Sequence, residues 1–128
     1  MRYADVVRPV GAPPAWLFGP VWSVIYMCYG LVGLVLASRR ASVPRALWLF
    51  YAAGWVVNLL WVPLFRDNFV HYGNGAFIAA LLFVVLNVAG LLWASPDRWV
   101  RTSALLLAPY VAWLAVATSL GFALFWLN

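Results

Sequence analysis

Long apolar runs separated by short polar segments are the dominant pattern of this sequence. Four runs can be delimited, and none contains an Asp, Glu, Lys, Arg or His near its middle. Each has about the 20 residues that an α-helix needs to cross roughly 30 Å of hydrocarbon. The runs also lack the alternation of polar and apolar residues that is typical of transmembrane strands. The pattern predicts transmembrane helices at residues 16–37, 46–65, 75–94 and 102–127.

We therefore expect an all-α membrane protein, a bundle of four transmembrane helices in one domain that covers residues 1–128. The composition agrees, because 67% of the residues are apolar and 9% are charged, whereas soluble domains have roughly 25% charged residues. The connections between the runs are too short for a further soluble domain. The first fourteen residues contain no apolar core of a signal peptide, so we expect the first helix to direct insertion itself.

The positive charges lie between the apolar runs, where they indicate topology. All eight cations are arginines, and their position outside the runs argues against a nucleic-acid partner in spite of the basic balance. The loops after the first and third helices have more arginines than the opposite side, which favours the cytoplasm for these loops. Both termini are then expected on the same side, outside the cytoplasm. The two groups are Arg39, Arg40, Arg45, Arg98 and Arg101 against Arg2, Arg8 and Arg66.

Residues for catalysis or metal binding are not apparent. Proton-coupled pumps and exporters need an ionisable group within the bilayer, and the middles of the four runs have none. His71 lies in a loop with no second His or Cys at ligand spacing, and Cys28 lies inside an apolar run. We expect no metal, no resident cofactor and no catalytic acid, base or nucleophile.

Polar, small and aromatic residues recur at helical spacing in three of the runs. An Asn or a Tyr hydroxyl at mid-depth gains nothing from facing lipid, so we expect the three faces to converge in the interior. Two interpretations remain open, tight packing between helices or a ligand pocket. The faces are Trp22, Tyr26, Gly30, Gly33 and Ala37; Gly54, Asn58, Trp61 and Phe65; and Tyr110, Trp113, Ala117, Gly121, Leu124 and Asn128. Tryptophans near the ends of runs, such as Trp93, Trp99 and Trp126, are typical of the interfacial belt.

Three motifs in order resemble the TspO family of tryptophan-rich sensory proteins, also called translocator proteins. The first is Pro13-Pro14-Ala15-Trp16-Leu17-Phe18-Gly19-Pro20-Val21-Trp22, followed by Tyr26 and Gly30. The second is Tyr51, Asn58, Trp61, Pro63 and Phe65. The third is Pro109-Tyr110-Val111-Ala112-Trp113, followed by Ala117-Thr118, with Leu127-Asn128 resembling the closing pair.

The resemblance implies a pocket between helices, open toward the end that carries Pro13-Pro14, and a tetrapyrrole of the protoporphyrin type as its ligand. Aromatic faces suit stacking on the macrocycle, and Arg8 or backbone donors at the start of the first helix could meet its carboxylates. The resemblance also leaves three functions open: sensor or regulator, transporter, and light-dependent degradation of porphyrin by an enzyme. The ligand-binding residues that it implies are Trp16, Phe18, Gly19, Trp22, Tyr26, Asn58, Trp61, Tyr110, Trp113 and Ala117.

The sequence departs from the family pattern in two respects. The resemblance implies five helices with the double proline after the first, and here that signature begins at Pro13. The resemblance then leaves two interpretations: a naturally short, four-helix member, or a truncated product or misplaced start. The second departure is Gly121, where the family usually has Asn. Because four helices leave apolar surface uncovered, we expect a homodimer, with Gly75 and Ala79, or Ala76 and Ala80, as small residues for close contact.

Overall fold

The computed structural model describes residues 7, 11–65, 71 and 73–128, and 88% of these residues are helical. Within this part of the chain there is no strand. Four spans are long and apolar enough to cross a membrane, the last of them continuous from Arg98 to Leu127. The predicted fold class is therefore confirmed. The elements are α1 (Ala15–Ser38), η2 (Arg40–Ser42), α2 (Arg45–Phe65), α3 (Gly73–Trp93), α4 (Arg98–Ser103), η3 (Ala104–Leu107) and α5 (Ala108–Leu127), where η denotes a 3₁₀-helix.

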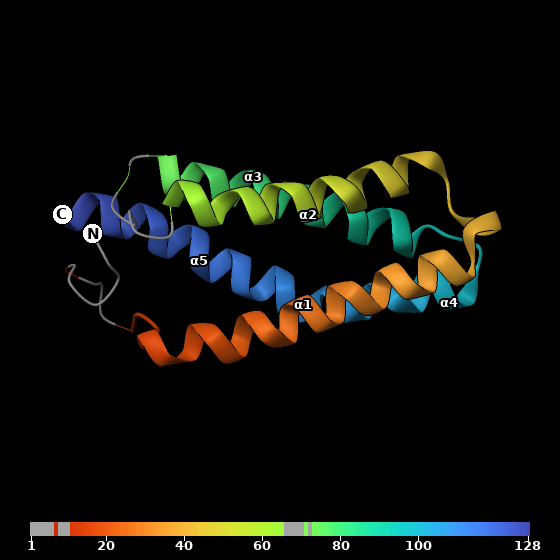
Figure 1. Ribbon diagram of the computed structural model, residues 1–128, viewed down its shortest axis with the longest axis horizontal. Coiled ribbons are helices and arrows are strands. Elements are labelled where there is room, and N and C mark those ends of the chain that lie inside the picture. Colours follow the sequence, from red (N-terminus) through yellow and green to blue (C-terminus); the bar gives the residue numbers. More distant parts are fainter. Residues whose placement is uncertain (1–6, 8–10, 66–70, 72) are drawn as a thin grey trace.

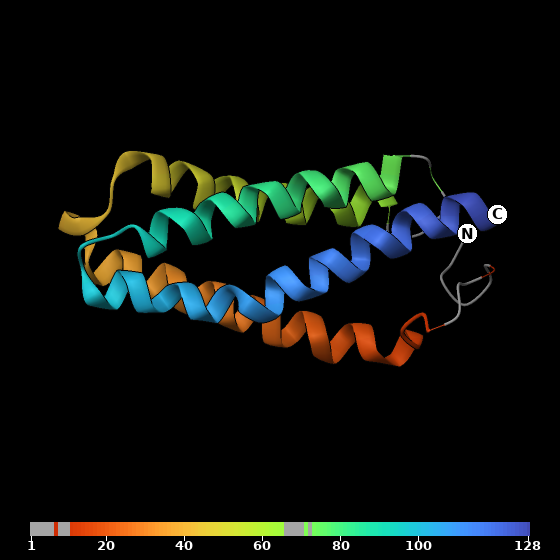
Figure 2. The same ribbon diagram turned by 180° about the vertical axis from the view of Figure 1, so that it is seen from behind.

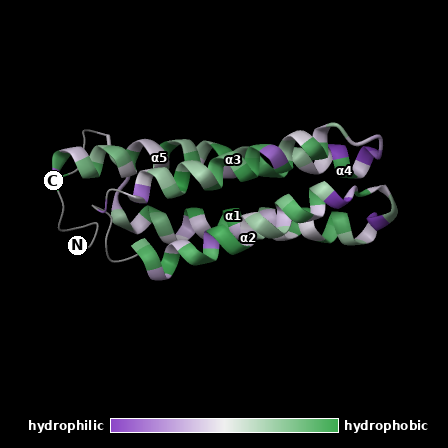
Figure 3. Cartoon of the chain, turned by 90° about the horizontal axis from the view of Figure 1, so that it is seen from above, coloured by the Kyte–Doolittle hydropathy of each residue, from purple (hydrophilic) through white to green (hydrophobic). Residues whose placement is uncertain are grey.

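The four spans run side by side along the long axis of the molecule (Figures 1 and 2). Helix α3 lies between α2 and α5, and α1 packs on α4 and η3. Away from α4, α1 and α5 diverge toward the end that holds the two termini (Figures 1 and 2). The view from above shows apolar residues along the whole length of the spans (Figure 3). This distribution is the one expected for a bundle whose outer surface meets lipid.

The fourth span starts earlier than the apolar run that predicted it. The Asp97 carboxylate accepts a hydrogen bond from the backbone N–H of Trp99 at 2.9 Å, so the helix begins at Arg98 rather than at residue 102. The short η3 segment follows because Pro109 has no N–H to donate to the carbonyl of Leu105. The third span also differs, since α3 covers Gly73–Trp93 instead of residues 75–94.

Reciprocal hydrogen bonds join α1 to α2. The Tyr29 hydroxyl donates to the backbone carbonyl of Tyr51, the Tyr51 hydroxyl donates to that of Tyr29, and both distances are 2.8 Å. Each phenol lies where the partner helix has a glycine, Gly54 opposite Tyr29 and Gly33 opposite Tyr51, with no space for a Cβ atom. The two glycines therefore admit the tyrosines that hold α1 against α2.

Glycines also set the distance between α3 and α5. A Cβ atom on Gly121 would lie 2.9 Å from the backbone Cα of Gly75, and one on Gly75 would lie 2.9 Å from the ring of Phe122. Backbone atoms cannot move aside as a flexible side chain can. The crossing of α3 and α5 is thus a direct backbone contact of the kind that small residues permit in membrane bundles.

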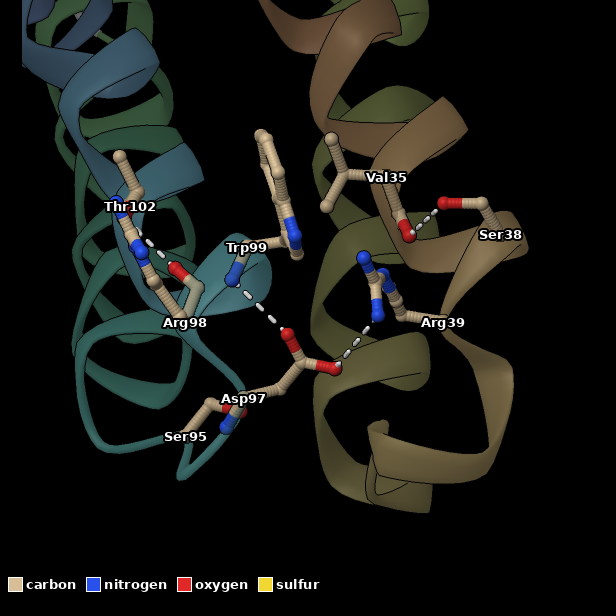
Figure 4. Close-up of polar contacts among 8 residues, drawn as sticks. All are labelled: Val35, Ser38, Arg39, Ser95, Asp97, Arg98, Trp99 and Thr102. Atoms are coloured by element: carbon tan, nitrogen blue, oxygen red, sulfur yellow. Dashed lines mark hydrogen bonds and ion pairs between the residues drawn. The ribbon is translucent and has the colours of Figure 1, made fainter.

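At the opposite end from the termini, a polar cluster joins α1 to α4 (Figure 4). The Arg39 guanidinium lies 4.0 Å from the Asp97 carboxylate and 5.8 Å from the centroid of the Trp99 ring. Removal from solvent opposes ionisation of Asp97, but hydrogen bonds from the backbone N–H groups of α4 and the Arg39 charge outweigh it. The pKa of Asp97 is therefore held below its ordinary value.

Candidate functional site

A cavity of about 320 Å³ lies among all four spans. Its walls are mostly aromatic and aliphatic, and no charged side chain is among the described residues that form them. Ligand pockets in proteins typically have volumes of about 300–1,000 Å³ and few polar groups, so this cavity is at the small, apolar end of that range. The lining residues are Phe18, Trp22, Tyr26, Asn58, Trp61, Val62, Asn74, Ile78, Leu81, Trp113, Leu114, Val116, Ala117, Leu120, Gly121 and Leu124.

The cavity lies in the half of the bundle that carries the double proline. Phe18 and Trp22 come from the first turns of α1, and Leu120 and Leu124 from the last turns of α5. At this end the backbone N–H of Val7 donates to Oδ1 of Asn128 at 3.1 Å, and Nδ2 of Asn128 donates to the Val7 carbonyl at 3.0 Å. Val7 and the end of α5 are thereby joined at this end of the bundle.

Aromatic rings from α1 and α5 form one wall. The Trp113 ring meets Phe18 edge-on at 5.5 Å between centroids, and it meets Trp22 edge-on at 6.5 Å. Trp22 in turn lies 5.6 Å from Tyr26. Edge-to-face pairs at these distances are favourable. They hold the indoles in fixed orientations around the cavity.

Hydrogen bonds connect the polar residues of the wall across all four spans. The Tyr26 hydroxyl of α1 donates to Oδ1 of Asn58 on α2 at 2.8 Å. Nδ2 of Asn58 donates to the Tyr110 hydroxyl of α5 at 2.6 Å. On the other side, Nε1 of Trp61 donates to Oδ1 of Asn74 at the start of α3, at 2.8 Å. Buried amides in hydrocarbon need such partners, so these bonds fix the shape of the wall.

One polar atom of the wall has no such partner. The indole Nε1 of Trp113 is buried and makes no hydrogen bond to any described residue. The described residues also contain no group of three His, Cys, Asp or Glu side chains that could hold a metal ion. The site offers aromatic surface and neutral hydrogen-bonding groups.

Seven of the ten residues that the family resemblance implied as ligand contacts line the cavity, namely Phe18, Trp22, Tyr26, Asn58, Trp61, Trp113 and Ala117. The other three have different positions. Tyr110 is buried behind Asn58, to which it is hydrogen-bonded. Trp16 is 72% exposed, and Gly19 has open space where a Cβ atom would be. Neither Trp16 nor Gly19 is among the lining residues.

Helix α3 contributes a part of the wall that the periodicity analysis did not find. Asn74, Ile78 and Leu81 line the cavity and are buried. They follow the same spacing of four and three as the other faces. Because the predicted third helix began at residue 75, Asn74 was assigned to a loop and this face was not recognised.

The departure at Gly121 has a steric reason. Gly121 lines the cavity at the point where α5 touches the backbone of Gly75. An Asn at this position would require α3 and α5 to separate. The tight crossing of these helices therefore leaves no space for a side chain here, and the wall has one polar group fewer than the family pattern implies.

Comparison with known proteins agrees with this architecture. The model of the TspO/MBR family matches residues 1–127. The tryptophan-rich sensory protein of Cereibacter sphaeroides is 32% identical over 98% of this chain and 76% of its own length. The translocator protein of Homo sapiens is 36% identical over 94% of this chain and 70% of its own length. Protein CrtK of Rhodobacter capsulatus is 31% identical over 98% of this chain and 78% of its own length. With four apolar spans, this integral, multi-pass membrane protein belongs to the TspO/MBR family.

Proposed function

We propose that this protein binds a tetrapyrrole of the protoporphyrin type in the cavity and acts as a sensor or regulator in the membrane. The observation that supports this most is the wall made by Trp22, Trp61 and Trp113, which come from α1, α2 and α5. Indole rings offer the stacking surface that a flat, apolar macrocycle needs. A relative named for sensing, the tryptophan-rich sensory protein, agrees with the sensor role.

The absence of charge from the described lining residues limits how such a ligand can lie. A carboxylate transferred into an apolar cavity without a cation is strongly disfavoured. The apolar edge of the macrocycle should therefore enter, and its carboxylates should remain at the end that carries the double proline. There, the first turn of α1 has backbone N–H groups without partners within the helix, which favour anions. Arg8, the cation expected to help, lies outside the described residues.

Tryptophan substitutions provide the direct test. Replacing Trp22, Trp61 or Trp113 singly with Leu should weaken porphyrin binding by about 1 kcal/mol or more, because stacking surface and shape are lost. Binding would be measured by titrating protoporphyrin IX and following its absorbance, with folding checked by circular dichroism. Trp93 and Trp99 are 62% and 61% exposed and serve as matched controls that should leave the affinity nearly unchanged. Equal losses in both sets would refute the proposed pocket.

Two alternative functions use the same cavity. A transporter agrees with the name translocator protein in mammalian relatives, although no Asp, Glu, Lys, Arg or His that could couple transport to protons is among the described residues that line the cavity. Counterflow of porphyrin in proteoliposomes would reveal transport. The second alternative is light-dependent degradation of a bound porphyrin with dissolved oxygen as the oxidant, because Trp22 and Trp113 lie against each other in the wall and both indoles could donate electrons to the excited ligand. Bleaching of the complex under illumination, absent in the Trp22→Leu variant, would identify this activity.

We also propose that two copies associate through the outer face of α3. Gly75, one of the small residues expected at a dimer contact, instead packs against α5 of the same chain. Ala76, Ala80 and Gly90 remain on the outside. Asn87 lies on the same face by its spacing and bonds only to the carbonyl of Phe83 in its own helix. An amide facing lipid gains from pairing with a second amide.

The dimer proposal is tested by mass measurement in mild detergent and in nanodiscs. Asn87→Leu should shift the population toward monomer. Asn58→Leu, which changes an amide inside the bundle, is the control and should leave the proportion of dimer unchanged. A strictly monomeric wild-type protein in both environments would contradict the proposal.

A further inference from the structure

We propose that the seam between the end of α1 and α4 is a binding site for the headgroup of an anionic phospholipid. Five arginines, Arg39, Arg40, Arg45, Arg98 and Arg101, gather at this end of the bundle, and all are exposed. Asp97 is the one acidic residue among the described part of the chain at this end. The cluster thus carries a formal charge of +4, five arginines less one aspartate.

Most of this charge is not neutralised within the described chain. The single ion pair recorded there joins Arg39 to Asp97 at 4.0 Å, the limit for such a pair. Arg40, Arg45, Arg98 and Arg101 have no acidic partner in the same part of the structure. An arginine guanidinium offers a planar set of donors that matches the oxygens of a phosphate, so unpaired arginines at one place favour a phosphate-bearing ligand.

Two of these arginines lie on either side of one exposed aromatic ring. Arg39 lies over the Trp99 indole at 5.8 Å, and Arg98 stands on the other side of that ring (Figure 4). Arg101 is three residues after Arg98 and therefore on the same side of α4. Trp99 is 61% exposed, as expected for an indole at the boundary between headgroups and hydrocarbon. Arg40 and Arg45 belong to η2 and the start of α2 instead.

The surroundings indicate a lipid rather than a free anion. Arg98 and Arg101 open the apolar span that continues to Leu127. Leu105, four residues beyond Arg101, is 64% exposed, so hydrocarbon-facing surface begins directly next to the charges. A ligand that fits has a phosphate at the arginines and an acyl chain beside the helix. Basic clusters at this depth attract anionic headgroups.

The test uses purified protein in neutral detergent micelles, where membrane orientation plays no part. Phosphatidylglycerol or phosphatidylcholine is added, and the unfolding temperature of the protein is measured as a function of the mole fraction of lipid in the micelles. Phosphatidylglycerol should raise the unfolding temperature at a lower mole fraction than phosphatidylcholine does. The double variant Arg98→Gln/Arg101→Gln should need about tenfold more phosphatidylglycerol for the same shift, as expected when charge-assisted hydrogen bonds are lost. The control Arg40→Gln/Arg45→Gln removes the same charge. It should change the amount of phosphatidylglycerol needed for that shift much less.

Three comparisons distinguish a specific lipid site from diffuse charge attraction, from binding of free phosphate and from a loss of folding. Equal losses in the two double variants would mean diffuse attraction to the whole charged end and would overturn the site. Inorganic phosphate at matching concentration should not reproduce the shift, and an equal shift would overturn the assignment to a lipid. If the glutamine variant does not fold, Arg98→Lys/Arg101→Lys keeps the charge but removes the planar donors. An unchanged response in that variant would also overturn the proposal.

Discussion

Asn58 is the polar residue on which the cavity wall depends most. Its side chain is 3% exposed and connects α1, α2 and α5 through Tyr26 and Tyr110. Both ends of the amide are therefore paired, which an apolar environment requires. Trp61 and Asn74 form the corresponding pair between α2 and α3. The residues with polar atoms in the wall thus also determine how the spans are held together.

The two tryptophans Trp61 and Trp113 should lose different amounts of stability on the same substitution. Trp61→Phe removes the donor to Asn74 and leaves a buried amide oxygen with one partner fewer, at an expected cost of about 1–3 kcal/mol. Trp113→Phe removes an N–H that has no partner, so stability should be nearly unchanged or higher. Unfolding in a denaturing detergent, followed by circular dichroism, measures both. A larger loss for Trp113→Phe than for Trp61→Phe would contradict this assignment of the two indoles.

At the scale of the helices, glycines decide which spans approach closely. Gly33 and Gly54 admit tyrosines between α1 and α2, and Gly75 and Gly121 bring the backbones of α3 and α5 together. Dispersion contacts of this kind are a main stabilising term in lipid, where the hydrophobic effect does not drive helices together. Gly121 lines the cavity, so the geometry of the contact between α3 and α5 bears on the width of the cavity.

Substitution of single glycines by alanine tests this view. Gly121→Ala places a Cβ atom 2.9 Å from the backbone of Gly75, so α3 and α5 must separate and stability should fall by about 1–3 kcal/mol. Gly30→Ala is the matched control, because a Cβ atom there meets nothing within 4 Å. That change should be neutral or stabilising by up to about 1 kcal/mol through helix propensity. Equal effects of the two substitutions would show that the crossing is not tight.

At the scale of the whole molecule, the two ends of the bundle are closed differently. The end with the termini is joined by the hydrogen bonds between Val7 and Asn128. The opposite end is joined by Asp97, which caps α4 and pairs with Arg39 of α1 (Figure 4). Helices α1 and α5 lie close together near the charged end and diverge toward the end where the cavity lies (Figures 1 and 2).

The contribution of Asp97 to the stability of the folded protein should depend on pH. The pKa of Asp97 in the folded protein lies below its ordinary value, so its ionised form is stabilised by folding. This contribution is fully present above the unfolded pKa, about 3.9, and is lost as the pH falls through the lower, folded value. The difference in unfolding free energy between the wild type and Asp97→Asn should therefore shrink on acidification. A difference that stays constant or grows at low pH would contradict the shift.

Topology is the second prediction at this scale. Since Val7 and Asn128 are hydrogen-bonded to each other, both should lie on one side of the membrane. The five arginines of the opposite end favour the cytoplasm for that end, and so the outside for the termini. With Cys28 replaced by Ala, cysteines introduced at Val7 and Asn128 should react equally with an impermeant reagent in intact cells. Opposite reactivity at the two positions would rule out this arrangement.

Much of the site could be predicted because helical periodicity is a local property. Trp22, Asn58, Trp61 and Trp113 were placed on converging faces by spacing alone, and they line the cavity. Tyr110 shared the same face but lies behind Asn58, since spacing cannot tell the first layer of a wall from the second. Trp16 and Gly19 were implied by a motif, and a motif does not state which side of the helix meets the cavity.

The sequence by itself determined the membrane class, the four spans and three of the four faces, because the length and period of apolar runs follow from the bilayer and the helix. Only the tertiary structure decided which spans are neighbours. Asn74 on α3, the contact between Gly75 and Gly121, and the unpaired N–H of Trp113 all result from that choice. These contacts join residues far apart in the chain, and nothing in either segment alone specifies its partner.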